Sequence, residues 1–134
     1  MKKIECIIMD WAGTAVDYGC FAPVAAFIEA FAEKGLVIDV VQTRKPMGLP
    51  KIQHIRELLL MPEVNRQFTA GYQRAWTEED VAELNRLFEK HLFASLKNYT
   101  DPIPGVIPTL EKLRAEGLKI GSTTGYTREM MDVV

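Results

Sequence analysis

The chain has 134 residues, of which 48% are hydrophobic and 25% charged, and it carries a formal net charge of −2. These values are typical of a globular protein with one hydrophobic core, and the length is short for two full domains. The charge supplies no basic surface for nucleic acid, and no apolar run approaches the roughly 20 residues of a membrane span. We therefore expect neither a nucleic acid nor a membrane as a partner.

The two cysteines, Cys6 and Cys20, show neither CxxC spacing nor the histidine neighbours of a metal site. Two cysteines are also too few for a disulfide framework, which favours a reducing cytoplasm. The apolar stretch behind the first lysines ends at Asp10 and is too short for a signal peptide.

The first predicted element is a strand over residues 3–9, KIECIIM. Its nearly continuous apolar pattern is typical of a buried, central strand in a parallel sheet. The strand ends at Asp10 and leads into a loop of small residues.

A long helical block follows. Helical spacing of apolar residues and turn residues at the boundaries define these elements, with Gly35 as a C-cap and Thr77 as an N-cap. Lys51 lies in the first turn of the third predicted helix, which halts at Pro62. The predicted helices of this block cover residues 22–33, 40–45, 51–61 and 77–92.

Residues 98–105, NYTDPIPG, give the densest turn signal in the chain and predict a hinge. A helix over residues 106–116, closed by Gly117, then precedes a second strand in LKIGSTTG, and another helix begins at Thr127. This order predicts an α/β fold in which a helical block is inserted between two parallel strands. We expect residues 1–20 and 100–134 to form a partial core domain and residues 21–99 a helical cap.

Asp10 and the loop Ser122-Thr123-Thr124-Gly125 follow the carboxyl ends of the two predicted strands, where α/β sheets bind ligands. An aspartate there can act as a nucleophile or bind a hard cation, and the alternative is that it only caps a turn. Gly13 and Thr14 favour chemistry, because a glycine and successive backbone amides can form an anion nest for phosphate.

These residues and the helical insertion resemble the haloacid dehalogenase superfamily, whose core is a Rossmann-like parallel sheet, here incomplete. The resemblance implies that Asp10 is the nucleophile and that Thr124 binds phosphoryl oxygens. Phosphatases of the superfamily carry a second aspartate two residues later, which protonates the leaving oxygen; this sequence has Ala12 there. A carbon leaving group needs an electron sink instead.

Lys51 can supply that sink through a Schiff base, and the alternative is a solvated surface lysine. The blocks DWAGTAVDYGCFAP, RKPMGLPKIQHIR and IGSTTGYTREMMD resemble the phosphonatase family of this superfamily. Its members hydrolyse the carbon–phosphorus bond of phosphonoacetaldehyde, giving acetaldehyde and phosphate. The resemblance implies a Schiff base on Lys51, an aspartyl phosphate on Asp10, Mg²⁺ held by Asp10 and the Ala12 carbonyl, and a homodimer through the cap.

Four further residues, and Gly125 of the second loop, are candidates for the site. His54, one turn after Lys51, would shuttle protons, or it is a packing histidine. Met47 and Cys20 would line the substrate pocket, or they fill the core. Tyr126, which follows Gly125 in the phosphate-binding loop, would contact substrate, or it packs as an ordinary tyrosine.

Two alternatives stay open. The chain can be a different phosphatase or dehalogenase of the superfamily, or a non-catalytic fragment that associates through an exposed core. The sequence stops shortly after the second-strand motif, before the basic and acidic motifs that the superfamily carries next. We therefore expect an N-terminal portion of such an enzyme, with an uncovered apolar face.

Overall fold

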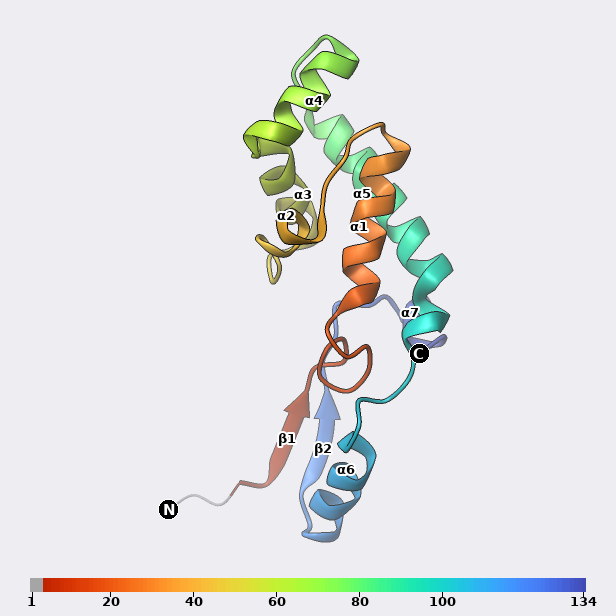
Figure 1. The fold of residues 1–134 in the computed structure, drawn as a ribbon. Coiled ribbons are helices and arrows are strands. Elements are labelled where there is room, and N and C mark those ends of the chain that lie inside the picture. Colours follow the sequence, from red (N-terminus) through yellow and green to blue (C-terminus); the bar gives the residue numbers. More distant parts are fainter. Residues whose placement is uncertain (1–3) are drawn as a thin grey trace. The chain divides into compact units, whose positions relative to one another are not determined.

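The computed structural model describes residues 4–134. The chain divides into two compact units. One consists of the chain up to Ala22 together with Leu96–Val134 and contains both strands, and the other, Pro23–Ser95, is helical (Figure 1). None of the helices in the described residues is long and apolar enough to cross a membrane.

The first unit is built on two parallel strands. β1 (Cys6–Met9) pairs with β2 (Lys119–Ser122), and Met9 lies opposite Ser122 at the carboxyl end of the pair. The predicted parallel pairing is thus confirmed, although the two strands are separated by more than a hundred residues of chain.

Short helices complete this unit. The 3₁₀ helix η1 (Leu96–Tyr99) precedes the turn-rich segment, and α6 (Val106–Ala115) then leads into β2 and contacts it. Gly117, with φ of +83°, ends α6 as predicted. α7 (Arg128–Met131) begins after Thr127, whose side chain accepts a hydrogen bond from Met130 N–H at 3.3 Å.

The prediction of a buried central strand is wrong for β1. Ile8 is 62% exposed, and inward and outward residues alternate along the strand. The reason is that β1 has only β2 beside it in the described residues, so one face and one edge meet solvent. Ile4 is exposed as well, which agrees with the expected uncovered apolar face, and Lys3 lies outside the described residues.

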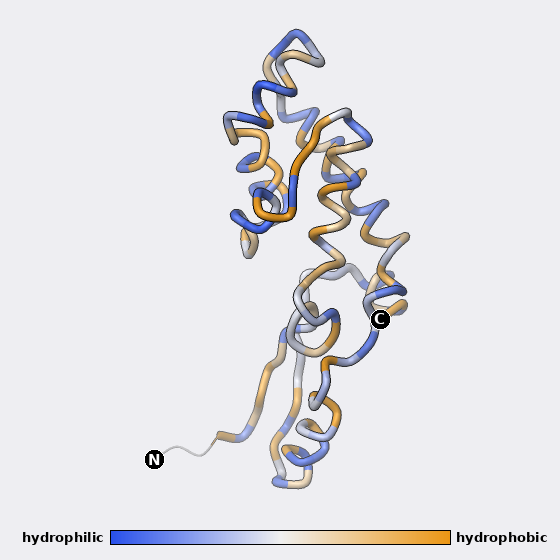
Figure 2. The backbone as a smooth tube through the Cα atoms, viewed as in Figure 1, coloured by the Kyte–Doolittle hydropathy of each residue, from blue (hydrophilic) through white to orange (hydrophobic). Residues whose placement is uncertain are grey.

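The second unit consists of helices with apolar inner faces, visible as alternating hydrophobic and hydrophilic stretches in Figure 2. α3 packs against both α4 and α5. The buried core of the helical unit includes Phe27, Phe31, Leu58, Phe68 and Phe88. The helices are α1 (Phe21–Glu33, whose first two residues belong to the other unit), α2 (Val40–Arg44), α3 (Lys51–Leu60), α4 (Pro62–Tyr72) and α5 (Glu78–Ser95).

Four of these helices agree with the prediction, and their ends show the expected chemistry. Gly35 adopts φ of +72° just after α1. Asp39 and Gln42 form a capping box at α2, in which each side chain bonds the other residue's backbone amide. Lys51 is the first residue of α3, directly after Pro50.

Helix α4 was not predicted from the sequence. Pro62 ends the periodic pattern of α3, but it also begins α4, because a proline is well suited to the first helical turn. Only Met61, in an extended conformation, separates the two helices.

The start of α5 is held by a buried carboxylate. Asp80 accepts hydrogen bonds from the backbone amide and hydroxyl of Thr77 and from both terminal nitrogens of the Arg74 guanidinium, at 2.7–2.9 Å. The guanidinium is the largest cause that holds the pKa of Asp80 well below its ordinary range. The predicted N-cap at Thr77 is therefore part of a charged cluster that fixes the α4–α5 turn.

Candidate active site

The carboxyl ends of the two strands meet, as the sequence predicts. Thr123 N–H donates a hydrogen bond to the carbonyl oxygen of Met9 at 2.8 Å, which extends the pairing one residue beyond β2. Asp10, the next residue after Met9, therefore lies beside the loop that contains Thr124, and its side chain is exposed. A carboxylate and a hydroxyl-rich loop share one edge of the sheet.

A pocket of about 260 Å³ opens at this edge. Its charged lining residues are Asp10 and Arg114, so an anion near the carboxylate meets one cation on α6. The remaining lining is mostly apolar and consists of Met9, Trp11, Ala15, Leu110, Ile120, Gly121 and Ser122.

The loop after Asp10 closes on the carbonyl oxygen of Trp11. The backbone amides of Thr14, Ala15 and Val16 all donate hydrogen bonds to this oxygen, at 2.8–3.1 Å. The Gly13 amide donates to the carbonyl oxygen of Val16 at 2.7 Å. The prediction that the amides of Gly13 and Thr14 form an anion nest is therefore wrong, because both are used inside the turn. The Thr14 side chain is exposed, so its hydroxyl, unlike its backbone amide, is still a candidate to bind an anion.

Cys20 supports this loop from inside. Its thiol donates a hydrogen bond to the Ala12 carbonyl oxygen at 3.1 Å. A Cβ atom on Gly13, where φ is +80°, would lie 2.7 Å from the Cys20 sulfur, so any other residue would strain the backbone and displace the thiol. The structure thus places Cys20 against the backbone of Ala12 and Gly13.

Asp17 is an important residue that sequence reasoning missed. It is 5% exposed, and its carboxylate accepts hydrogen bonds from the amides of Phe21 and Ala22, at 3.0 and 2.9 Å. It satisfies the first free amides of α1, as a capping acid does. The only signal in the sequence is an acid a few residues before a helix, which many surface turns share.

The second loop fixes the Thr124 hydroxyl. Tyr126 N–H donates to the Thr124 Oγ1 at 3.1 Å, so the oxygen is held as an acceptor and the hydroxyl hydrogen can point to another group. The Tyr126 hydroxyl is buried and makes no hydrogen bond to the described residues. Burial, followed by the negative charges of neighbours that include Asp17 and Asp10, raises the pKa of Tyr126 to about 12. It stays a neutral hydrogen-bond donor near pH 7.

Lys51 and His54 occupy successive turns of α3 in the helical unit. The Lys51 Nζ lies over the rings of Phe27 and Phe88, with distances to their centroids of 5.8 and 5.4 Å. Lys51 is half-buried, so it is not the fully solvated lysine of the alternative interpretation.

The His54 side chain is completely buried, and neither ring nitrogen has a hydrogen-bond partner among the described residues. Its ring stacks on Phe27 at 4.1 Å. Burial, and then the positive charge of Lys51, lower the pKa of His54 to about 4, while the backbone of Thr43 acts weakly in the opposite direction. His54 is neutral near pH 7, with unsatisfied nitrogen atoms.

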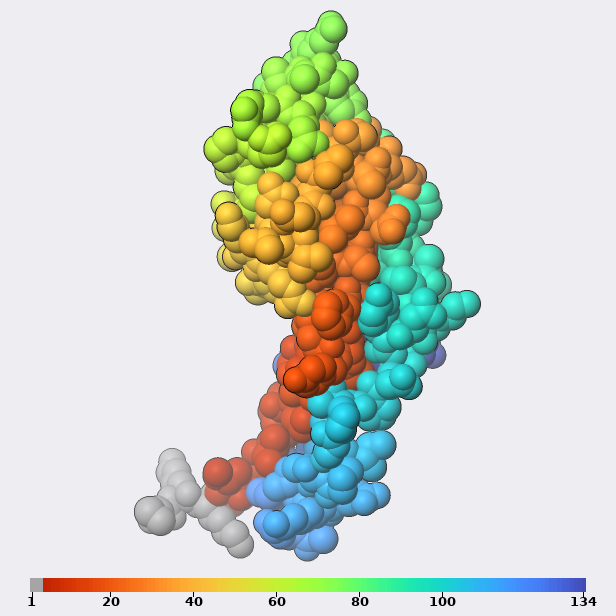
Figure 3. Space-filling view, viewed as in Figure 1, coloured from red at the N-terminus to blue at the C-terminus, as the bar shows by residue number. Residues whose placement is uncertain are grey.

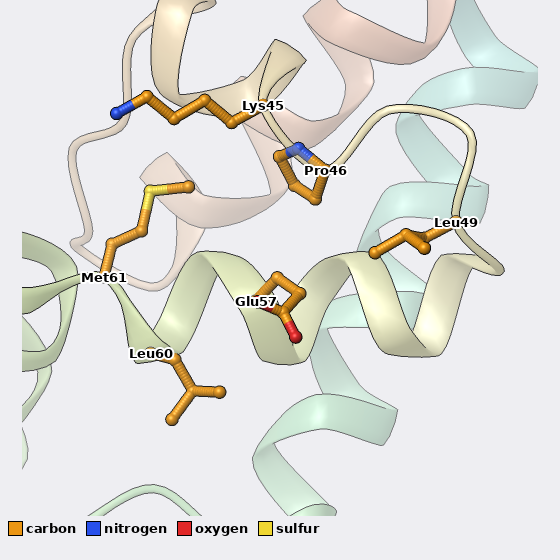
Figure 4. A pocket seen from close by; sticks show the side chains of 6 residues that line it. All are labelled: Lys45, Pro46, Leu49, Glu57, Leu60 and Met61. Carbon is orange, nitrogen blue, oxygen red and sulfur yellow. The ribbon is translucent and has the colours of Figure 1, made fainter.

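Met47 is half-buried in the turn that joins α2 to α3. A pocket of about 400 Å³ lies in the same unit, between α3 and the segment that joins α2 to it (Figure 4). None of the predicted site residues lines this pocket, whose lining is Lys45, Pro46, Leu49, Glu57, Leu60 and Met61.

The residues expected to hold a metal ion provide oxygen atoms of the right kind but few of them. Within residues 4–134 no group of three His, Cys, Asp or Glu side chains is placed to hold a metal ion. Asp10 offers an exposed carboxylate, and the Ala12 carbonyl keeps one lone pair beyond the thiol hydrogen bond. These two oxygens suit Mg²⁺, which takes its remaining ligands from water or from further groups.

Comparison with known proteins gives a close sequence match. The chain is 90% identical over 134 residues to a phosphonoacetaldehyde hydrolase of Bacteroides fragilis, a match that covers 100% of this chain and 51% of that protein. The chain therefore spans about half the length of the curated relatives that it matches. No protein-family model matches it.

Solved structures agree with this match. A phosphonoacetaldehyde hydrolase-like protein from Oleispira antarctica has a TM-score of 0.92 and 36% identity, covering 98% of this chain and 48% of that one. A haloacid dehalogenase-like hydrolase from Streptococcus pneumoniae has a TM-score of 0.68 and 21% identity, covering 99% of this chain and 55% of that one. The second likeness shows the fold alone.

Proposed function

We propose that this chain, which matches phosphonoacetaldehyde hydrolases over about half of their length, supplies the nucleophile and the Schiff-base lysine of such an enzyme. The reaction is hydrolysis of the carbon–phosphorus bond of phosphonoacetaldehyde to acetaldehyde and phosphate, in the cytoplasm. We also infer that residues 1–20 and 100–134 belong to a Rossmann-like core and residues 21–99 to an inserted cap. The observation that carries the proposal is the 90% identity over an alignment that spans the whole chain, and therefore all three site blocks.

In this proposal Lys51 forms the electron sink. Its neutral amine attacks the aldehyde carbon, water leaves, and a protonated imine results. His54 lies one turn away on the same helix, and in this proposal it relays a proton to and from the attacking nitrogen. Met47 and Cys20 line the substrate pocket in this proposal.

Asp10 acts on the phosphorus. Its carboxylate oxygen attacks, the carbon–phosphorus bond breaks, and the bonding electrons move to the iminium nitrogen to give an enamine. Protonation of the enamine carbon and hydrolysis of the imine release acetaldehyde and restore Lys51. Water then hydrolyses the aspartyl phosphate. No acid is needed at position 12, because the leaving carbon carries its charge into the imine.

In this proposal the loop after β2, which contains Thr124 and Gly125, binds the phosphoryl group. The Thr124 hydroxyl, fixed by Tyr126 N–H, donates to a phosphoryl oxygen, and Gly125 allows close approach of the substrate. The exposed Thr14 hydroxyl is a further donor, Gly13 allows the tight turn of the first loop, and Tyr126 contributes to the substrate site through the loop that it fixes. Asp10 and the Ala12 carbonyl would hold Mg²⁺, which supplies positive charge for the phosphoryl oxygens when bound.

The proposal is tested by reductive trapping in the complete protein that the gene encodes. Borohydride with phosphonoacetaldehyde should attach a stable adduct to Lys51, located by peptide mass spectrometry. Lys51→Arg should abolish the adduct, while Lys45→Arg, a change at an exposed lysine of the same unit, should leave it intact. Absence of an adduct in the folded natural protein would contradict the proposal.

The two halves of the mechanism can be separated. Asp10→Asn should abolish phosphate release yet keep trapping on Lys51, because imine formation does not use the carboxylate. Release of phosphate from ordinary monoesters, with none from the phosphonate, would instead support a phosphatase of the same superfamily.

We further propose that two copies pair through the helical unit. Val37, which precedes α2, and Val41, which lies within it, are 74% and 67% exposed, and their segment lies on the visible surface in Figure 3. Burying such side chains favours association. Val41→Glu should shift sedimentation toward the monomer, whereas Ala70→Glu, at an exposed position of α4, should not. A monomeric natural protein would contradict the pairing.

A further inference from the structure

Three aromatic rings from three helices form one stack in the helical unit. Phe27 of α1 stacks on His54 of α3 with centroids 4.1 Å apart, and on Phe88 of α5 at 4.2 Å. All three side chains are at most 2% exposed. Rings held from three helices in a packed core have little freedom to move.

The Lys51 amine lies against this stack. Its Nζ is within 5.8 Å of both the Phe27 and the Phe88 centroids, inside the roughly 6 Å range over which aromatic faces attract cations. The third ring, His54, is uncharged near pH 7 and so does not repel the ammonium. A lysine side chain otherwise has four flexible bonds, and ordering it costs up to about 2 kcal/mol.

We propose that Phe27 and Phe88 form an aromatic platform that positions the Lys51 nitrogen for imine formation. The proposal rests on the proposed Schiff base and adds two positioning residues to it. The attraction acts on the resting ammonium, which holds the side chain in place before deprotonation, and again on the iminium; it is absent in the short-lived neutral amine that attacks the aldehyde. It ends when carbon–phosphorus cleavage converts the iminium into a neutral enamine, so the platform holds the nitrogen up to that step and then weakens.

The platform predicts a specific role for the electrons of the Phe88 ring. Fluorine atoms withdraw electron density from the ring face and weaken its attraction for a cation, while the ring keeps nearly the same shape. Phe88 is the ring to change, because it is closer to Nζ and is not the ring that stacks on His54. A leucine there would remove packing as well.

The experiment places mono-, di- and trifluorophenylalanine at position 88 of the complete protein and measures the rate of borohydride trapping at Lys51. The rate should fall stepwise, by about fivefold for three fluorines. The matched control is the same series at Phe68, a fully buried ring that stacks on Tyr72 and lies 5.4 Å from the Arg74 guanidinium carbon. Trapping should not change in that series.

Equal rates across the Phe88 series, or equal losses in both series, would overturn the platform while trapping itself upheld the Schiff base. A substrate-free measurement covers the case in which no adduct forms at all. The Lys51 Hε resonances should be displaced by ring currents in the natural protein and should move toward ordinary lysine positions in Phe88→Leu, but not in Phe68→Leu. Resonances at ordinary positions in the natural protein would overturn the platform whether or not Lys51 forms an imine.

Discussion

The thiol of Cys20 donates a hydrogen bond to the carbonyl oxygen of Ala12, eight positions earlier in the chain, at 3.1 Å. The contact closes the loop after Asp10 into a small ring of backbone and side chain. The Cys20 sulfur occupies the space that a side chain at position 13 would need. Cys20 and Gly13 therefore depend on each other, and the carbonyl that we propose as a metal ligand is held in place by both.

Gly13→Ala should destabilise the first unit by roughly 2–4 kcal/mol, because it combines a left-handed backbone with a contact of 2.7 Å to the Cys20 sulfur. Gly117→Ala is the matched control: its φ of +83° is nearly the same, and no atom lies near the added Cβ. We expect this control to be destabilised by about 1–2 kcal/mol, from backbone strain alone. Urea unfolding followed by Trp11 fluorescence, with Trp76 replaced by Phe, measures both changes.

The extra loss at Gly13 should shrink when Cys20 is replaced by Ala, since the sulfur that causes the clash is then absent. An unchanged difference between the two glycine variants in that background would show that the Cys20 contact is not its cause.

Asp17→Ala should cost about 2 kcal/mol, since two helix amides lose their acceptor and an alanine at φ of +55° is strained. Asp17→Asn should lose about half as much, because an amide oxygen still accepts one bond and asparagine tolerates this backbone. The same fluorescence assay ranks the variants. Equal losses for Ala and Asn would argue against capping as the role of Asp17.

Thr124→Val should lower kcat/KM for phosphonoacetaldehyde by at least about tenfold, because the hydroxyl donor to the phosphoryl group is removed while the shape is kept. Thr124→Ser should retain most of the activity. Thr123→Val is the control, since its contribution to the sheet is a backbone amide that the substitution leaves unchanged. Steady-state phosphate release in the complete protein compares the three, and equal losses at both positions would count against the role of Thr124.

The helical unit should lose stability as the pH falls from about 6.5 to about 4. Burial holds the pKa of folded His54 at about 4, so over this range the unfolded chain takes up a proton that the folded chain does not. The contribution of neutral His54 to the free energy of unfolding is fully present above its pKa in the unfolded chain. It decreases by roughly 1–3 kcal/mol as the pH falls across this range. Trp76 fluorescence, with Trp11 replaced by Phe, reports the unfolding.

His54→Phe keeps a ring stacked on Phe27, but this ring cannot bind a proton. The free energy of unfolding of the variant should therefore lack the decrease that His54 causes between about pH 6.5 and pH 4. The same slope in both proteins would show that His54 is not the group responsible.

Local patterns in the sequence were enough to predict the elements that carry the proposed chemistry. The apolar run before Asp10 and the one before Ser122 predicted two parallel strands with neighbouring ends, because each run is followed by polar loop residues. The periodicity after Pro50 likewise placed Lys51 in the first turn of a helix, as the structure has it.

What the sequence could not predict depends on groups far apart in the chain or on backbone geometry. Pro62 has the same local signal whether it ends one helix or starts the next. The inward direction of the Gly13 and Thr14 amides follows from how the turn closes on Trp11, which residue type does not determine. The stack of Phe27 on Phe88 joins positions 61 residues apart, and no short pattern encodes it.

The two-stranded sheet has a consequence for handling this 134-residue chain by itself. Each strand offers an unpaired edge within the described residues, and Ile4 and Ile8 leave apolar surface beside it. Such edges are templates on which further strands add between molecules, and a two-stranded ribbon is only marginally stable alone. The exposed Lys119 on β2 is the kind of charge that opposes such growth. Replacing it with a neutral residue should lower the concentration at which the chain begins to aggregate.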